Sequence, residues 1–321
     1  MQPPFVDRVE ELERLRELAS RGFYPVAYLY GPEGCGKTRL LREFLKEVKS
    51  WGDCIAIYID AQSVKSVDEA LWSSDREVFQ LLTELASSVA GPVGRALALA
   101  VTMIVRRLRR GLVEGRRILI VVDDVARPLG IESVELYSKN LLSLLEELYS
   151  LGAAAVTIVA TTSEGLSRRL VARHSYARLF QLWNLGPDAA KRLLEALGAP
   201  RDLLDVLWKL TGGNPRSIVE LWRGGWDVGA WVERVSRSVR IALEDLLPTY
   251  GRELLEICRD IDAIASYPEL RDRLIELNLV TPVDRPCLGY TPPPDPELGI
   301  GERYAWQLPV YREIVKRVVT S

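Results

Sequence analysis

The sequence predicts an α/β fold with a parallel sheet of five strands, followed by a small helical region and a C-terminal winged-helix region. Short aliphatic runs alternate with stretches of helical periodicity over residues 1–184, which is typical of a parallel sheet covered on both faces. A glycine-rich loop joins the first of these runs to a helix. Residues 185–227 favour short helices, and residues 228–321 favour helices followed by two strands. We therefore expect three domains with these boundaries.

Composition restricts the class of protein. A chain of 321 residues that is 48% hydrophobic and 27% charged can bury a core and keep a charged surface. The net charge of −2 argues against a protein that binds nucleic acid through its overall charge. The four cysteines have no metal-ligand spacing, which favours reduced thiols and a cytoplasmic location. Abundant charged residues with little Asn, Gln, His or Met resemble thermophile composition.

The loop at residues 31–38, Gly-Pro-Glu-Gly-Cys-Gly-Lys-Thr, matches the phosphate-binding pattern G-x-x-x-x-G-K-[ST]. A short apolar run, Val26–Tyr30, precedes it, and a segment with helical spacing follows it. Glycines let backbone N–H groups turn inward, and a helix N-terminus adds partial positive charge. We expect Lys37 to reach the β- and γ-phosphates of a nucleoside triphosphate and the Thr38 hydroxyl to ligate Mg²⁺.

A second candidate site lies at the end of the aliphatic run Ile118–Val122, which is followed by Asp123 and Asp124. In open α/β sheets, ligands bind at the C-terminal ends of the strands. Asp123 is therefore expected to hold Mg²⁺, directly or through water. Asp124 is expected to orient or deprotonate the attacking water.

The run at residues 155–162 is predicted to be another strand, and it ends in Thr161 and Thr162. Their hydroxyls either bind the γ-phosphate or the water, or cap the next helix, and the sequence leaves both interpretations open. Arg168, Arg169 and Arg173 follow as candidates for an arginine finger, although arginines at such positions are commonly solvated. Residues 55–59 and 178–182 complete the predicted sheet.

The stretch Ala86–Val105 is mostly small and aliphatic, which makes it a candidate membrane segment, and four arginines follow closely after it. Its uninterrupted part is too short to span a bilayer, and a membrane-surface helix is the alternative to a buried one. The sequence favours a buried helix that ends in a solvated basic turn. No membrane span is therefore predicted.

The C-terminal region is predicted to contain helices at residues 230–247, 250–259, 267–277 and 310–319, with a returning strand at 303–308. Helices with a two-stranded hairpin favour a winged-helix fold, which often binds DNA. Residues 228–321 contain 12 basic and 15 acidic side chains, a net charge of −3. Because a phosphate-binding face needs clustered Lys and Arg, this region is expected to contact protein rather than DNA.

Together these motifs resemble the archaeal AAA-type ATPases, a P-loop NTPase family similar to the signal-transduction ATPases (STAND) and to archaeal origin-recognition initiators. The resemblance covers nearly the whole chain. It makes residues 31–38 the Walker A motif and residues 118–124 the Walker B motif, with Asp124 where many relatives have Glu. Residues 5–8 and 10–12 resemble the adenine-contacting box, and residues 161–163 lie where the sensor 1 residue belongs. Residues 212–216 resemble the lid motif whose proline packs near adenine in STAND relatives.

The resemblance implies an ATPase core, a helical lid and a winged helix. The catalytic residues expected on this basis are Lys37, Asp124 and Thr162, and the metal ligands are Thr38 and Asp123. The residues expected to bind ATP or ADP are Val6, Arg8, Gly31, Pro32, Gly34, Cys35, Gly36, Lys37, Thr38, Arg39, Pro215 and Arg216. Cys35 is either an accessible thiol that nucleotide protects from modification or a buried and inert one.

The function predicted from these features is an ATP-binding, slowly ATP-hydrolysing switch that depends on Mg²⁺ and acts on a macromolecular partner. Nucleotide is expected between the sheet domain and the lid, and the partner at the winged helix. One alternative is an ATP-dependent DNA-binding protein of the initiator type, and another is a scaffold that binds nucleotide without hydrolysing it. The oligomeric state and the partner are left open.

Overall fold

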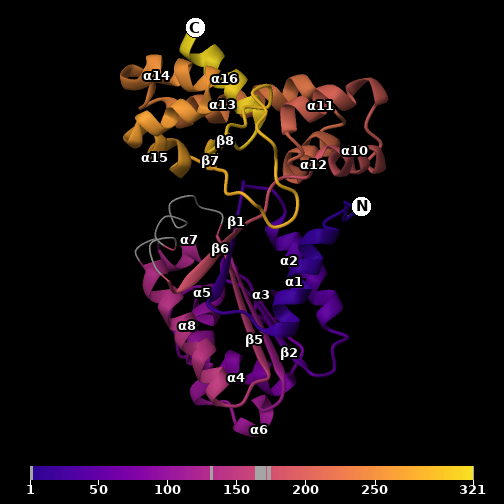
Figure 1. The fold of residues 1–321 in the computed structure, drawn as a ribbon, viewed down its shortest axis with the longest axis vertical. Coiled ribbons are helices and arrows are strands. Elements are labelled where there is room, and N and C mark those ends of the chain that lie inside the picture. The colour runs from indigo at the N-terminus through magenta and orange to yellow at the C-terminus, as the bar shows by residue number, and fades with distance from the viewer. Residues whose placement is uncertain (1–2, 131–132, 163–170, 172–174, 321) are drawn as a thin grey trace. The chain divides into compact units, whose positions relative to one another are not determined.

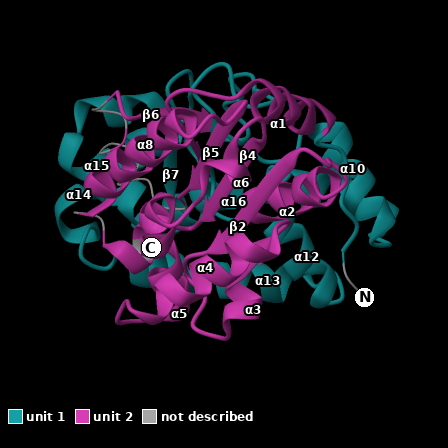
Figure 2. Ribbon diagram, turned by 90° about the horizontal axis from the view of Figure 1, so that it is seen from below, with its two compact units in different colours: residues 1–8, 31–36, 181–321 teal, residues 9–30, 37–180 magenta. Residues whose placement is uncertain are grey.

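The fold is described from a computed structural model for residues 3–130, 133–162, 171 and 175–320. It contains two compact units, which are coloured separately in Figure 2. Unit 1 comprises residues 1–8, 31–36 and 181–321, and unit 2 comprises residues 9–30 and 37–180. The chain therefore crosses between the units inside the glycine-rich loop.

Unit 2 contains a six-stranded sheet with the strand order β3-β2-β4-β5-β1-β6. The strands are β1 (Val26–Tyr30), β2 (Cys54–Asp60), β3 (Leu71–Ser73), β4 (Arg117–Asp123), β5 (Ala155–Thr161) and β6 (Ala177–Gln181). The pairs β1–β5, β2–β4 and β4–β5 are parallel. The aliphatic runs form fully buried strands, as expected for a parallel sheet covered on both faces.

The prediction of five strands, all parallel, was wrong because of β3. This edge strand pairs antiparallel with β2, so that Tyr58 lies opposite Trp72. Three residues within a long helical stretch carry no alternation by which a strand could be recognised. Pairing is reinforced next to the strand, where the Ser74 hydroxyl accepts a hydrogen bond from the N–H of Ala56 (2.9 Å) and donates to the carbonyl of Cys54 (3.2 Å).

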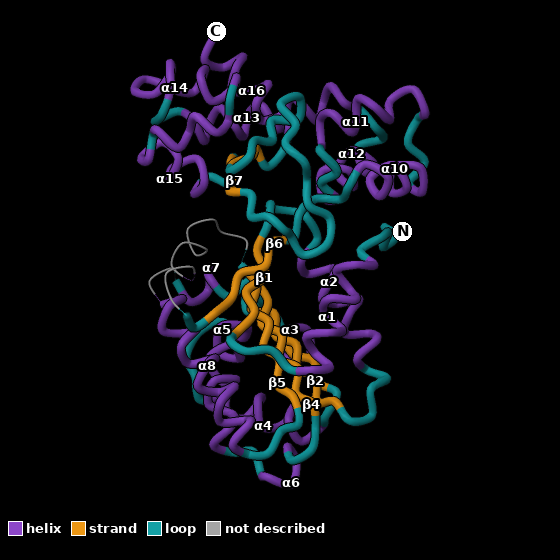
Figure 3. Tube along the Cα trace, viewed as in Figure 1, coloured by secondary structure: helices purple, strands orange, loops and turns teal. Residues whose placement is uncertain are grey.

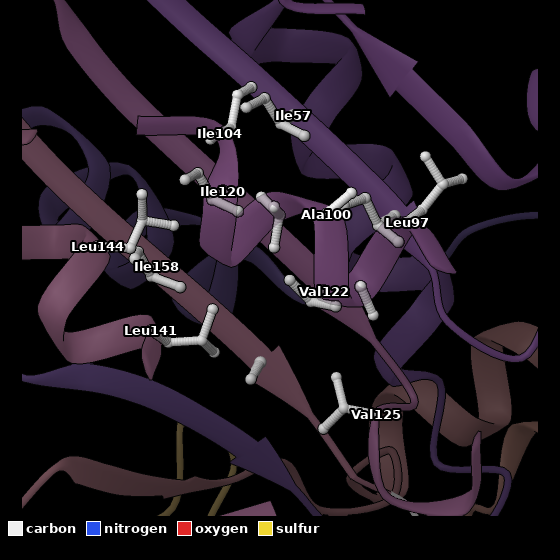
Figure 4. Packing of buried hydrophobic residues seen from close by; sticks show 14 of the residues in the cluster. Ile57, Leu97, Ala100, Ile104, Ile120, Val122, Val125, Leu141, Leu144 and Ile158 are labelled. Carbon is white, nitrogen blue, oxygen red and sulfur yellow. The ribbon is translucent and has the colours of Figure 1, made fainter. Parts of the chain in front are cut away.

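Helices cover both faces of the sheet (Figures 1 and 3). The helices of unit 2 are α1 (Val9–Arg21), α2 (Lys37–Val48), α3 (Val67–Ala70), α4 (Arg76–Ser87), α5 (Val93–Met103), α6 (Arg110–Val113), α7 (Ala126–Leu129) and α8 (Val134–Ser150). Helices α1 and α2 lie on one face, and α5 and α8 lie on the other. Every second residue of the central strand β4 packs under α5 and α8 in a large apolar cluster, which includes Ile120 and Val122 (Figure 4).

The apolar segment considered for a membrane role forms α5, and its side chains Leu97, Ala100 and Val101 are buried in this cluster. Its sequence is apolar because the helix packs against the sheet and α8. No helix in the described parts of the chain has the length and apolar character needed to cross a bilayer.

Unit 1 is mainly helical after β6. Its helices are α10 (Pro187–Ala196), α11 (Leu204–Thr211), α12 (Pro215–Arg223), α13 (Val228–Leu243), α14 (Leu247–Arg259), α15 (Pro268–Glu276) and α16 (Pro309–Thr320). One hydrophobic cluster extends from α10 through α16, and it includes Leu193, Ile218, Trp231 and Ile314. The regions predicted to be the lid and the winged helix therefore share a core.

A short antiparallel hairpin pairs β7 (Val280–Pro282) with β8 (Tyr304–Trp306). The carboxylate of Asp262 fastens this hairpin, because it accepts hydrogen bonds from the backbone N–H groups of Glu302, Arg303 and Tyr304 at 2.6–3.0 Å. Gln181 holds the proline-rich connection between the strands. Its side-chain amide donates to the carbonyl of Pro282, and its side-chain oxygen accepts from the N–H of Asp284.

Candidate nucleotide-binding site

The loop at residues 31–36 has a backbone conformation that explains its glycines. Gly34 and Gly36 have φ values of +80° and +102°, in a region that residues with a side chain rarely adopt. At Gly31, an added Cβ would lie 2.0 Å from the carbonyl oxygen of Leu182. The loop therefore needs glycine both for its turns and for the close approach of a neighbouring segment. Helix α2 begins directly after the loop, at Lys37.

Arg8 lies against this loop. Its guanidinium is buried and donates hydrogen bonds to the carbonyl oxygens of Cys35 (2.9 Å) and Trp183 (2.8 Å). Val6 is half-buried against the cluster formed by α10 to α16. The adenine-contacting role predicted for both residues stays a prediction. The contacts show that Arg8 also links the N-terminal segment to the loop.

Residues 214–216, which resemble part of a lid motif, contact the same loop. Asn214 caps α12 and donates from its side-chain amide to the carbonyl of Glu33 (2.8 Å). The N–H of Arg216 donates to the carbonyl of Gly34 (3.3 Å), and its guanidinium pairs with the Glu33 carboxylate (2.6 Å). Pro215 would be 4.0 Å from a Cβ added at Gly36. Pro215 and Arg216, which were predicted from the resemblance, are thus next to the loop, and Asn214 was missed.

The remaining loop positions differ in accessibility. Cys35 is fully buried, which favours the alternative of an inert thiol. Pro32 is buried and accepts a hydrogen bond from the N–H of Cys35 (3.2 Å). Lys37 is buried at the start of α2. Arg39 forms an ion pair with Glu43 one turn further along this helix (2.9 Å). The nucleotide-binding roles of these residues remain predictions.

Asp123, the last residue of β4, is buried and held by two hydroxyl groups in unit 2. Tyr58 of β2 donates to Oδ2 (2.9 Å), and Thr161 of β5 donates to Oδ1 (2.5 Å). Burial raises the pKa of Tyr58 well above its usual range, and the charge of Asp123 raises this pKa further. Tyr58 therefore stays protonated and can donate. Each carboxylate oxygen retains a second lone pair for a cation or its water.

Asp124 follows with a φ of +54°, a left-handed conformation that Asp tolerates better than most residues. Its N–H donates to the Thr161 hydroxyl (2.8 Å), so Thr161 contacts both acids of the Walker B motif. Thr162, the residue chosen from the sequence, is buried, and its N–H donates to the carbonyl of Leu29 on β1 (3.2 Å).

Tyr58 and Thr161 are the site residues that sequence reasoning missed or passed over. The sequence contained a signal for Thr161, because a hydroxyl at the end of one strand can contact an acid at the end of the adjacent strand. For Tyr58 it was absent, since nothing in the sequence shows that β2 lies beside β4. Ser163 of the sensor segment and the candidate finger arginines Arg168, Arg169 and Arg173 lie outside the described residues.

A hollow of about 800 Å³ in unit 2 is lined by Thr38, Asp123 and Asp124, together with Tyr58 and Asp60 of β2. The hydroxyl and carboxylate oxygens that face it are ligands that Mg²⁺ prefers, and Mg²⁺ usually takes only one or two protein carboxylates beside water and phosphate. Among the described residues, no group of three or more His, Cys, Asp or Glu could hold a metal by itself. The donor set therefore fits a magnesium ion that arrives with phosphate.

Comparison with known proteins identifies the family. Residues 5–221 match the model of a family described as an ATPase domain predominantly from Archaea. The chain belongs to this family. The matched range begins at Phe5 and ends in α12, so it includes the loop, Asp123 and residues 212–216.

The individual proteins that this chain resembles share little sequence identity with it. An uncharacterised ATP-binding protein of Pyrococcus abyssi is 24% identical over 78% of this chain and 82% of its own length. A second one, from Pyrococcus horikoshii, is 25% identical over 72% of this chain and 78% of its own length. Among solved structures, Cdc6p of Pyrobaculum aerophilum aligns with a TM-score of 0.43 at 17% identity, covering 99% of this chain and 96% of that one.

Proposed function

We propose that the protein binds ATP with Mg²⁺, hydrolyses it slowly, and uses the nucleotide state to control a macromolecular partner. The single observation that carries the proposal is the Asp123 carboxylate, which two hydroxyls orient and which shares a hollow with the Thr38 side chain. Membership in the archaeal ATPase family supports it, and the Pyrococcus relatives are named as ATP-binding proteins.

The role proposed for each residue follows from the chemistry of its functional group. Lys37 supplies a positive charge to the β- and γ-phosphates, and the glycine loop supplies backbone N–H groups. Thr38 and Asp123 hold the magnesium ion, whose chemistry is to neutralise charge on the phosphates. Asp124 lines the same hollow and is the proposed base or orienting group for water.

The proposed output lies in the region after residue 228. Three helices and an antiparallel hairpin in this order support a winged-helix assignment. The region has a net charge of −3, which favours a protein partner over DNA. We propose the lid at residues 185–227 and the winged helix at 228–321 as separate functional regions, although they share one hydrophobic cluster.

A single-turnover experiment on the wild type and Lys37→Ala tests the enzymatic part. The wild type is expected to bind Mg-ATP and release phosphate slowly. Lys37→Ala removes a point charge from the phosphates and should lose ATP binding by calorimetry while its circular dichroism spectrum is unchanged. Normal ATP affinity in a folded Lys37→Ala protein would refute the assignment of the loop.

Co-purification from a native extract, first with ATP and then with ADP, tests the switch. A protein retained in one nucleotide state and lost in the other is the expected result. Equal retention in both states, with hydrolysis intact, would leave an ATPase that does not act as a switch on that partner.

A further inference from the structure

The backbone of Glu33 in the phosphate loop is held by side chains from two distant parts of unit 1. Its N–H donates to Oε1 of Gln307 (2.8 Å), and its carbonyl accepts from Nδ2 of Asn214 (2.8 Å). The Asn214 amide also donates to Oδ1 of Asn184 (2.9 Å). Gln307, Asn214 and Asn184 are 5%, 1% and 2% exposed, so the three side chains are buried beside the exposed residue Glu33. Because a buried amide that loses its partner is costly, the three side chains hold the loop firmly.

Gln307 differs from the other two because it belongs to the C-terminal hairpin. It follows β8 directly and lies two residues before α16. Its own N–H donates to the carbonyl of Leu279 on the opposite side of the hairpin (2.9 Å). Its carbonyl accepts from Nδ2 of Asn184 (3.3 Å). The side chain that touches the phosphate loop is therefore fixed by the backbone of the hairpin.

This arrangement connects two regions that the proposed function needs to connect. The bond from Gln307 holds the backbone of residue 33 in one conformation, so phosphate binding that favours this conformation also favours the bond. A displacement of the hairpin by a partner must in turn change the loop, because coupling between two binding sites is reciprocal. The direct connection passes through the Gln307 side chain, and a longer one runs from the Gln307 carbonyl through Asn184 and Asn214 to the carbonyl of Glu33. Both lie within unit 1.

We propose that Gln307 is a positioning residue that couples the phosphate loop to the β7–β8 hairpin and α16. This inference rests on the proposed function, since it names the route by which nucleotide reaches the partner-binding region. The proposal predicts that removal of the Gln307 acceptor weakens ATP binding and reduces the response of the hairpin to nucleotide.

The test compares Gln307→Met with Gln181→Met. Met keeps most of the volume of Gln but has no strong acceptor. Gln181 is a matched control because it is also buried in unit 1 and also anchors the C-terminal segment, at Pro282 and Asp284, with no contact to residue 33 among the hydrogen bonds of the described chain. Both variants lose stability if the roles are merely structural, so two further readouts are needed.

The first readout is Mg-ATP affinity by calorimetry. We expect about a tenfold loss for Gln307→Met, within the range of measured couplings, and less than a twofold change for Gln181→Met. The second readout is amide hydrogen exchange with and without Mg-ATP. In the wild type and in Gln181→Met, nucleotide should alter exchange both in residues 31–38 and in residues 303–308. In Gln307→Met, the change in residues 303–308 should be clearly smaller than in the wild type, while the change in the loop remains.

Each outcome is decisive. Equal affinity in Gln307→Met and the wild type, or an unchanged response of residues 303–308 in Gln307→Met, would overturn the role of Gln307 and leave the ATPase proposal intact. A wild-type protein that binds no Mg-ATP would overturn the proposed function together with this inference. In the absence of nucleotide, Gln307→Met should also raise the exchange rate of the Glu33 amide, and a rate equal to that of the wild type would contradict the bond itself.

Discussion

At the scale of single residues, hydroxyl groups from two neighbouring strands position Asp123. The hydroxyls of Tyr58 and Thr161 reach it from β2 and β5, and Arg42 donates in turn to the Tyr58 hydroxyl (3.2 Å). Hydrogen bonds from hydroxyls to a carboxylate fix its orientation without neutralising its charge. The magnesium ligand proposed here is therefore preorganised before any ion binds.

Asp124 is the residue whose substitution tests the proposed base. Asn also tolerates the left-handed conformation, so Asp124→Asn should keep the backbone and the ATP affinity. Loss of a general base typically lowers the rate on the order of 10²-fold or more. We expect such a fall in single-turnover hydrolysis for Asp124→Asn, and a rate kept or raised in Asp124→Glu, whose carboxylate reaches further. An unchanged rate in Asp124→Asn would mean that another group activates the water.

The cysteines should be unreactive in the native protein. Burial raises the pKa of Cys54 and Cys287 to about 11 and that of Cys258 to about 12, and Cys35 is fully buried. At pH 8 we expect slow reaction of all four thiols with a disulfide reagent and rapid reaction after unfolding in urea. One fast native thiol would contradict this expectation.

The sign of the accompanying pH dependence follows from the same pKa values. Below about pH 8.5, where unfolded thiols keep their protons, these cysteines add no pH dependence to stability. Between about pH 8.5 and 11, unfolded thiols lose protons that the native thiols retain. Their contribution therefore lowers the free energy of unfolding as the pH rises. Replacement of Cys54, Cys258 and Cys287 by Ala should weaken this alkaline decline in urea titrations.

At the scale of elements, the short hairpin depends on a side chain outside it. Strands of three residues contribute little by themselves, and the Asp262 carboxylate takes three N–H groups at the start of β8. The hairpin is therefore fixed from the segment that precedes α15.

Asp262→Ala should accordingly destabilise the protein more than its partly exposed position suggests. We expect a loss of about 2 kcal/mol in the free energy of unfolding, since hydrogen bonds to a charged acceptor are lost together. Glu302→Ala is the control, because this side chain is exposed, and its effect should stay within about 0.5 kcal/mol. Equal effects in urea denaturation would show that the carboxylate does not fasten the hairpin.

At the scale of the whole molecule, charge decides which partner is favoured. The net charge of the chain is −2, and that of residues 228–321 is −3. The local exception is a hollow of about 370 Å³ between α13 and α16, where Arg237, Arg240 and Arg317 gather. Arg237 is paired with Glu233, which reduces the charge available to an anion.

We therefore expect weak binding of duplex DNA at physiological salt, with an affinity that falls steeply as salt increases. Fluorescence anisotropy with a labelled duplex at several salt concentrations measures this. Arg240→Glu should abolish whatever weak binding is present, and Arg192→Glu, in α10, is a control on a different helix. A tight, sequence-specific complex at physiological salt would contradict the expectation and favour an initiator-type protein.

The sequence by itself determined the elements that local pattern encodes. The motif at residues 31–38 identified the phosphate loop, and aliphatic runs located β1, β2, β4 and β5, because a strand buried on both faces must be apolar along its length. The edge strand β6, which is only partly buried, was also predicted. The pair Asp123 and Asp124 at the C-terminal end of β4 stood out for the same reason, as charge that ends a buried aliphatic run. These features depend on residues that are neighbours in the chain.

Only the tertiary structure decided which distant residues meet. It added β3, whose three residues lie in a stretch of helical pattern, and it brought Tyr58 and Thr161 to Asp123 through the order of the strands. It also placed Gln307 against Glu33, 274 positions away in the chain. A hydrogen bond needs only a donor and an acceptor about 3 Å apart, and a side chain that makes one looks like any other polar residue in the sequence. The local sequence pattern cannot reveal such contacts, because the packing of distant segments is what brings the donor and the acceptor together.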